Sequence, residues 1–257
     1  MQSRFIFCAN AVAVADNTEP PTQAGKAWAT ATLPMTGGHV TAGPESYQSS
    51  AFSFGSATAH VKGWYDGSCY VTENTVVVEN LNIGDWLHAD RIEVCLKFQY
   101  KESPRELTVN VTQKPYTGLQ IQGQDFSDVT FSEAIPRIAG ADDEAFRKEL
   151  ENGKLLKGKY RIHKSKSPSG RGLKVESSIA QDSRLVFDPL TGDFGYCSVK
   201  NLAGQETARV YLGEWAEDDD WQGVVGLRVE FRNPDTAKIE RQIVVADWLQ
   251  DNGEFFP

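Results

Sequence analysis

The sequence predicts an all-β protein: an antiparallel β-sandwich or jelly-roll-like domain with one short helical insertion. Roughly ten or more short segments have strand patterns, a number typical of a two-sheet sandwich. The clearest is 91–100, where apolar and polar residues alternate strictly, as in a strand with one buried face. Turn-forming residues separate the segments, for example at Asn233-Pro234-Asp235.

The composition is that of a folded domain. The 257 residues are 40% hydrophobic and 24% charged, and the length suits one large β domain. The formal net charge is −9, so the chain as a whole repels phosphate and is not expected to bind nucleic acid. No run approaches the ~20 apolar residues of a membrane-spanning helix, so no transmembrane segment is expected.

The first 50 residues differ in composition from the rest of the chain. Met1–Ala15 is similar to an export signal with a short apolar core, and a first β-strand is the alternative interpretation. Pro20-Pro21 and Gly37-Gly38 interrupt any long regular element. We therefore predict an extended N-terminal arm over 1–50, which could add a strand to a neighbouring subunit. The alternative is that the arm packs on its own domain.

Residues 51–257 are predicted to form the β-sandwich domain. Its expected strands lie at 51–61, 70–79, 91–100, 107–112, 119–121, 159–164, 172–180, 184–188, 194–199, 208–214, 224–232 and 238–246. One helix is expected over 142–152, because Asp142 can cap it and Phe146 and Leu150 lie one turn apart. Gly153 then follows at the position that commonly ends a helix.

Four cysteines are present, and none has the spacing of a zinc site. Cys69 and Cys95 lie in separate strand-like segments and would form a disulfide if the protein is exported. The alternative is that all four cysteines are buried thiols, which behave as small apolar side chains.

The sharpest local feature is an acidic run between two tryptophans. Clustered carboxylates on a loop can hold Ca²⁺, and tryptophans beside carboxylates are typical of sugar-binding loops. The alternative is a solvated hairpin tip in which the acids stay in water. The residues concerned are Glu214, Trp215, Glu217, Asp218, Asp219, Asp220 and Trp221.

A basic hairpin is predicted over 154–174, where eight basic residues occur without any acid. It is a candidate assembly surface or a site for a polyanion or anionic lipid, and the alternative is a solvated hairpin that balances neighbouring charge. If the acidic and basic loops meet between copies, head to tail, they would build a ring or filament. The eight residues are Lys154, Lys157, Lys159, Arg161, Lys164, Lys166, Arg171 and Lys174.

The sequence contains none of the nucleophile, phosphate-loop or metalloprotease motifs that mark common enzymes. We therefore predict a non-enzymatic protein without a cofactor, calcium being the one ion that the acidic run would suit. Two carboxylates across a cleft, as in a glycosidase, are the enzymatic alternative. The remaining tryptophans, Trp28, Trp64, Trp86 and Trp248, are expected to be core or interface anchors.

Two stretches resemble a known family. ENTVVVENLNIGDWLHADRIEV (Glu73–Val94), followed by PYTGLQIQGQDF (Pro115–Phe126), is similar to secreted bacterial choice-of-anchor β domains. The resemblance covers about residues 73–126 and implies an exported, surface-associated β-sandwich with no known enzymatic activity.

These observations predict a non-enzymatic extracellular or cell-surface β-sandwich protein. Its expected role is self-assembly into a filament, ring or layer as a homo-oligomer, or service as a structural or adhesive subunit. A carbohydrate-binding, lectin-like module using Trp215 and Trp221 is the first alternative. A glycan-active enzyme using paired carboxylates is the second.

Overall fold

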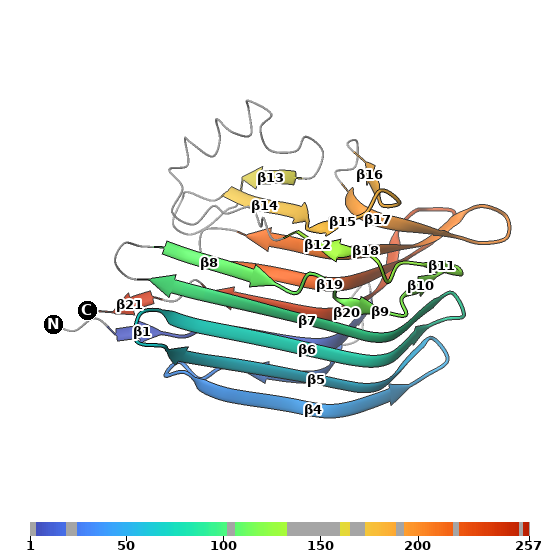
Figure 1. Ribbon diagram of the computed structural model, residues 1–257. Coiled ribbons are helices and arrows are strands. Elements are labelled where there is room, and N and C mark those ends of the chain that lie inside the picture. Colours follow the sequence, from blue (N-terminus) through green and yellow to red (C-terminus); the bar gives the residue numbers. More distant parts are fainter. Residues whose placement is uncertain are drawn as a thin grey trace.

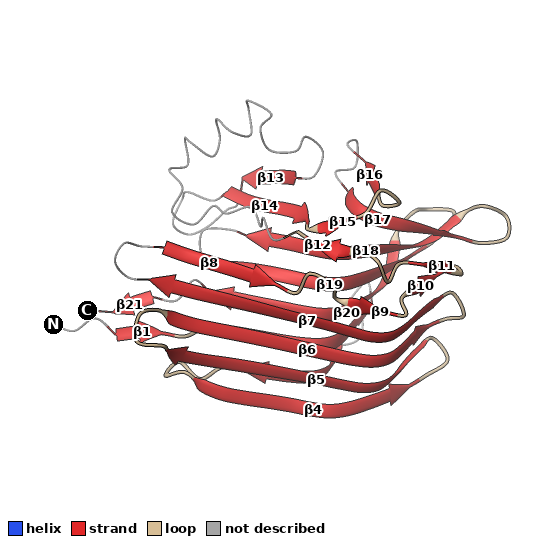
Figure 2. Ribbon diagram, viewed as in Figure 1, coloured by secondary structure: helices blue, strands red, loops and turns tan. Residues whose placement is uncertain are grey.

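The protein is an all-β sandwich (Figure 1). The computed structural model describes residues 4–18, 25–101, 106–132, 160–164, 173–188, 193–217, 221–251 and 254–256. Every regular element among them is a strand, as Figure 2 shows, so the all-β class is confirmed. The helix predicted over 142–152 lies outside the described residues.

One sheet, here called the front sheet, is built on a four-strand antiparallel meander, β4 to β7. Short strands continue it beyond β7, which pairs with β8, β9 and β10. Its strands are β4 (Gly38–Gln48), β5 (Phe52–Tyr65), β6 (Tyr70–Ile83), β7 (Leu87–Lys101), β8 (Glu106–Val111), β9 (Tyr116–Thr117), β10 (Gln120–Ile121) and β11 (Gln124–Asp125).

The second sheet, the back sheet, has the order β13-β14-β18-β19-β20-β2-β3, with β17 also paired to β18 and β16 to β17. Its strands are β2 (Ala9–Thr18), β3 (Lys26–Thr32), β13 (Tyr160–Lys164), β14 (Leu173–Ser178), β16 (Val186–Asp188), β17 (Asp193–Lys200), β18 (Glu206–Glu217), β19 (Trp221–Arg232) and β20 (Ile239–Asp251).

Two small sheets complete the described structure. Strand β1 (Arg4–Ile6) pairs with β21 (Glu254–Phe256), which brings the two ends of the chain together. Strand β12 (Thr130–Phe131) pairs with β15 (Ala180–Gln181).

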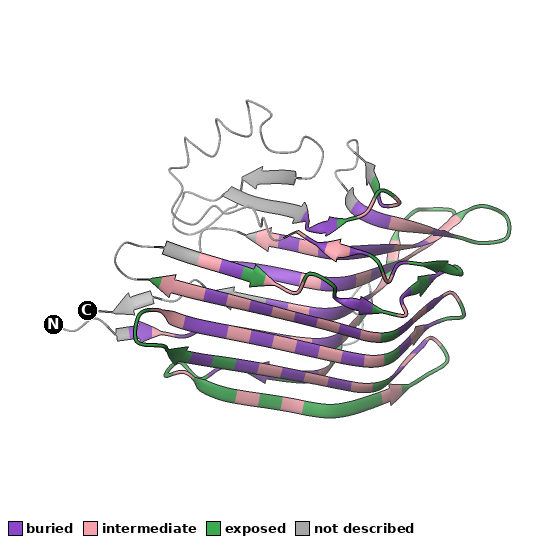
Figure 3. Ribbon diagram, viewed as in Figure 1, coloured by how far each residue is buried: buried purple, intermediate pink, exposed green. Residues whose placement is uncertain are grey.

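The core lies between the two large sheets and follows the alternation of the strands. Figure 3 shows buried and part-buried residues alternating along β5, β6 and β7. The predicted face of β7, which includes Ile92, Val94 and Leu96, is fully buried. The sheets approach closely at Gly226, where a Cβ atom would lie 2.9 Å from Cγ2 of Val94.

The N-terminal segment is not a free arm. Ala9–Thr18 forms β2, which pairs with β20 on one side and β3 on the other, inside the back sheet. The following strand, β4, pairs with β5 in the front sheet. Small residues such as Ala11 and Ala13 are fully buried in β2, so the described residues 9–18 and 25–48 pack on their own domain.

The predicted Cys69–Cys95 disulfide is wrong. Cys95 lies opposite Thr75 in the β6–β7 register, whereas Cys69 directly precedes β6. Six residues of strand, about 20 Å, therefore separate the two positions along the sheet. A disulfide needs Cα atoms within ~7 Å, and none of the four cysteines is in a disulfide.

The back sheet reverses its inward and outward faces along one line that crosses five strands. Leu212, Leu227 and Val245 point inward on one side of the line, and Trp215, Val224 and Trp248 point inward on the other. In every second strand the line passes through a residue with positive φ, which shifts the alternation of side chains by one position. These residues are Gly213 (φ 61°) in β18, Ala246 (φ 56°) in β20 and Ala29 (φ 50°) in β3. In the strands between them, the line passes through Gly226 of β19 and Ala13 of β2.

Candidate functional site

The most exposed aromatic residues of the described chain lie where β5 ends. Trp64 is 36% exposed and Tyr65 is 56% exposed. Because successive strand residues point to opposite faces, the two rings flank the end of the strand from either side. We call this surface the aromatic end; it consists of Phe5, Trp64, Tyr65, Tyr70 and Tyr100.

A stack of rings supports Tyr65 from within. Tyr65, Tyr70 and Tyr100 are aligned across three strands. The Tyr65 and Tyr70 ring centroids are 4.9 Å apart, and Tyr70 stacks on Phe5 at 4.2 Å with an interplanar angle of 15°. Phe5 belongs to β1, which β21 holds in place. Tyr65 is therefore the solvent-facing member of a preorganised aromatic cluster.

Polar side chains surround Trp64 on the outer face of the front sheet. The Lys97 ammonium lies 6.0 Å from the centre of the indole ring. Lys62, in the same strand as Trp64, forms an ion pair at 3.4 Å with Glu73 of the neighbouring strand β6. Trp64 lies across from Val71, which is buried although it belongs to the outer face. The indole thus presents one apolar face beside hydrogen-bonding groups.

A carboxylate lies in the turn that follows Tyr65. Oδ1 of Asp66 accepts hydrogen bonds from the backbone N–H groups of Cys69 (2.7 Å) and Ser68 (2.8 Å) and from the Ser68 hydroxyl (2.9 Å). These bonds, that of Cys69 foremost, lower the pKa of the Asp66 carboxyl. The Tyr65 hydroxyl donates to the Gly67 carbonyl at 2.9 Å. An ordered, ionised carboxylate therefore lies beside exposed aromatic rings.

The acidic run predicted as a sugar or calcium loop has a different environment. Trp215 is 1% exposed and points into the core, so it cannot stack on a sugar. Arg228 binds Oε1 and Oε2 of Glu214 at 2.6 Å each, which leaves neither oxygen for calcium. Asp218–Asp220 and the side chains of Glu217 and Trp221 lie outside the described residues.

Glu214 is one end of a charged ladder on the outer face of the back sheet. Arg228 bridges Glu214 and Glu230, and its guanidinium lies 3.9 Å from the centre of the Tyr211 ring. Arg232 also binds Glu230, at 2.6 Å. Burial opposes ionisation of Glu230, but the two arginines outweigh it and lower the pKa of its carboxyl. Within the ladder each carboxylate is bound by an arginine, and only Nε of Arg232 is buried without a partner, so the ladder serves the structure.

Asp247 lies on the same outer face without such a partner. The register runs from Glu214 through Val225 to Asp247 and on to Val12, so two apolar residues flank Asp247. Burial, and secondly the negative charge of Glu214, raise the pKa of the Asp247 carboxyl to about 6. The reversals at Gly213 and Ala246 are the reason that Glu214 and Asp247 both face outward. No pattern in the sequence indicated this pair.

The strand ends next to the basic and acidic segments are neighbours within one chain. Val175, near the start of β14, lies opposite Glu217, at the end of β18. Residues 165–172 and 218–220, which hold the loops between these strand ends and their sequence neighbours, lie outside the described residues.

Only part of the predicted basic patch can be placed. Arg161 and Lys164 lie in β13, and Lys174 lies in β14. The remaining members fall outside the described residues: Lys154, Lys157, Lys159, Lys166 and Arg171.

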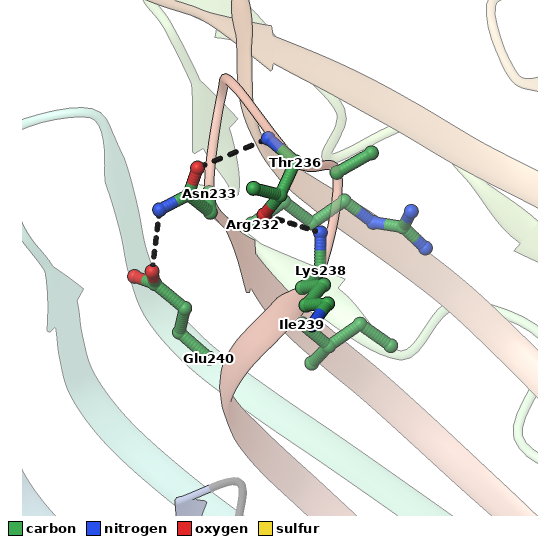
Figure 4. Close-up of a pocket in the computed structure, with 7 residues that line it drawn as sticks. Arg232, Asn233, Thr236, Lys238, Ile239 and Glu240 are labelled. Carbon is green, nitrogen blue, oxygen red and sulfur yellow. Dashed lines mark hydrogen bonds between the residues drawn. The ribbon is translucent and has the colours of Figure 1, made fainter.

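An open pocket of about 760 Å³ lies at the β19–β20 turn (Figure 4). Its lining residues are Arg232, Asn233, Thr236, Ala237, Lys238, Ile239 and Glu240. Oδ1 of Asn233 accepts the Asp235 and Thr236 N–H groups at 3.0 and 3.1 Å, and its amide donates to Glu240 at 2.9 Å. The sequence predicted this turn, but not the pocket beside it.

Two features are absent from the described residues. These residues contain no cluster of three or more His, Cys, Asp or Glu side chains that could hold a metal ion. They also contain no helix long and apolar enough to cross a membrane.

Comparison with known proteins identifies a family. No curated protein matches the sequence. A family model described as a domain of unknown function (DUF8256) matches residues 5–181, a range that includes the whole front sheet and the aromatic end. Since the match spans more than half of the 257 residues, the chain belongs to the DUF8256 family.

Proposed function

We propose that this chain is a non-enzymatic adhesive module that binds glycans through its aromatic end. The observation that carries the proposal is the exposure of Trp64 and Tyr65 next to the ordered carboxylate of Asp66. An aromatic ring packs against the C–H face of a sugar, and neighbouring polar groups bind its hydroxyls. The aromatic–carboxylate combination predicted for the acidic run thus occurs at the end of β5.

Preorganisation supports the same surface. The stack on Phe5 fixes Tyr65, and three hydrogen bonds fix Asp66 before any ligand arrives. Ordering a side chain on binding costs about 0.5–1.5 kcal/mol, so a rigid site retains more of its contact energy. The extracellular or cell-surface location expected from the choice-of-anchor resemblance belongs to this proposal, because glycans are abundant there.

A glycan array tests the proposal. The wild-type chain should bind one class of glycans, and Trp64→Ala and Tyr65→Ala should each weaken binding at least tenfold. Val186→Ala is a matched control, since Val186 is an exposed apolar residue of β16 in the back sheet and the variant should bind normally. Melting temperatures of all variants separate lost binding from lost folding. Wild-type binding that both aromatic variants retain would refute the assignment of the site.

A further inference from the structure

The turn between β17 and β18 presents an isolated apolar side chain. Leu202 is fully exposed, and it is the most exposed large apolar residue in the described part of the chain. The β17–β18 turn lies at the end of the sandwich opposite to β1 and β21 (Figure 1). Single exposed leucines are common on protein surfaces, so the local structure decides whether this one has a role.

The turn holds Leu202 rigidly without using its side chain. The Asn201 N–H donates to the Gln205 carbonyl at 2.9 Å, and the Gly204 N–H donates to the Asn201 carbonyl at 2.9 Å. Oδ1 of Asn201 also accepts the N–H groups of Ala203 and Gln205, both at 3.0 Å. A rigid turn with an exposed leucine is preorganised to insert that side chain into a partner.

A receptor for such a side chain lies on the next turn of the same sheet. Strand β18 begins where β19 ends, with Ala208 opposite Phe231, so the turns before β18 and after β19 leave the same end. The second turn contains the open pocket of about 760 Å³, whose lining includes the apolar residues Ala237 and Ile239. Leu202 of the same copy does not fill it, since that side chain is fully exposed.

Charge complementarity identifies the occupant as a second copy of this chain. Lys200 is exposed at the base of the Leu202 turn, and its carbonyl is fixed by the Gln122 amide at 2.7 Å. The pocket turn exposes Asp235, Glu240 and one uncompensated cation, Lys238, because Arg232 is bound to Glu230. A positive leucine turn therefore faces a negative pocket turn when two copies meet end to end.

We propose that two copies of this chain associate through a twofold axis, each inserting Leu202 into the pocket beside Ile239 of the other. Both complementary features occur at one end of each copy, as a self-complementary twofold interface requires. The aromatic ends of both copies stay exposed on the far sides. The proposal does not depend on what the aromatic end binds.

Sedimentation velocity over a wide concentration range tests the interface. The wild-type chain should form dimers, and Leu202→Asp should weaken their association constant by at least about 30-fold, as expected for a central anchor residue. Thr236→Trp, which fills the pocket, should also yield monomers. Met35→Asp is the matched control. Met35 is an apolar residue that is 67% exposed in the turn between β3 and β4, away from the proposed interface, so this variant should dimerise like the wild type.

A mixture separates this arrangement from any other dimer. Leu202→Asp keeps its pocket and Thr236→Trp keeps its leucine, so together they can form one of the two contacts. The mixture should therefore contain a heterodimer that neither variant forms alone. A wild-type chain that stays monomeric overturns the proposal, and so does a Leu202→Asp dimer of wild-type strength or a Met35→Asp monomer.

Discussion

The carboxylate of Glu45 accepts a hydrogen bond from the backbone N–H of Ala29 at 3.0 Å, and so joins the edges of the two sheets. Ala29 lies in β3 and Glu45 in β4, and among the described strands each of these strands is paired on one side only. Unpaired edge N–H groups are where a foreign strand can add. The Glu45 side chain occupies one of them.

Glu45→Ala should therefore destabilise the chain and promote its aggregation. The loss of one hydrogen bond should lower the free energy of unfolding by about 0.5–1.5 kcal/mol, which urea unfolding can measure. The freed Ala29 N–H should raise light scattering at high concentration and elevated temperature. Glu45→Gln is the control, because its amide oxygen can still accept the bond. Equal scattering by Glu45→Ala and wild type would show that the edge is protected by other means.

Asp247→Asn should stabilise the protein at neutral pH. Because the folded state raises the pKa of Asp247 from 3.8 to about 6, the stability that this group contributes is fully present below pH ~4 and is lost as pH rises through 6. Replacing the carboxyl by an amide should raise the free energy of unfolding by roughly 3 kcal/mol at pH 7.5 and by almost nothing at pH 3.5. Urea unfolding of the wild type and the variant at both pH values measures this difference. A difference that does not change with pH would contradict the raised pKa of Asp247.

Asn74→Leu should also stabilise the protein. Asn74 is fully buried in β6, between Val61 and Leu96, and neither its amide nitrogen nor its amide oxygen has a hydrogen-bond partner. A leucine has a similar size and no polar atoms, so the substitution should raise the free energy of unfolding by about 1–3 kcal/mol, the cost of leaving the buried amide unsatisfied. Asn110→Leu, at an exposed position of β8, is the control with little expected change. Destabilisation by Asn74→Leu would mean that the amide makes a stabilising interaction.

The four cysteines should differ in their rates of alkylation. Cys8 is exposed, whereas burial raises the pKa of the Cys95 and Cys197 thiols and lowers their thiolate fraction. Maleimide labelling at pH 7.5, followed by peptide mass spectrometry, should find Cys8 modified first. Faster labelling of Cys95 than of Cys8 would contradict this order, and recovery of a Cys69–Cys95 disulfide after mild oxidation would contradict the β6–β7 register.

Alternation predicted the strands well wherever one face is buried. Segment 91–100 became part of β7, and Ile92, Val94 and Leu96 point inward as expected. For 1–15 a first β-strand was only one of two interpretations, because small residues such as Ala11 and Ala13 carry little hydrophobic signal. Strand β20, with which β2 pairs, lies more than 200 residues away in sequence, and no local pattern encodes that pairing.

The misassignment of Trp215 has a local cause. Alternation from Val210 through Leu212 would place Glu214 inside and Trp215 outside. The positive φ of Gly213 shifts the pattern by one residue, so Trp215 points into the core and Glu214 reaches Arg228. Trp64 was taken for a core or interface anchor, although the turn residues Asp66 and Gly67 begin two positions after it. An aromatic residue at a strand end beside a turn was the available signal.

The line of reversal also determines how β20 tolerates mutation. Before Ala246, polar substitutions should be accepted at Gln242 and rejected at Ile243 and Val245; after it, they should be accepted at Asp247 and rejected at Trp248. Even and odd positions thus exchange their roles halfway along one continuous strand. The two halves therefore tolerate substitution with opposite parity. Deleting Ala246 itself would leave a regular alternation, with Val245 inward, Asp247 outward and Trp248 inward, whereas a one-residue deletion elsewhere in the strand would move the side chains beyond it to the wrong face.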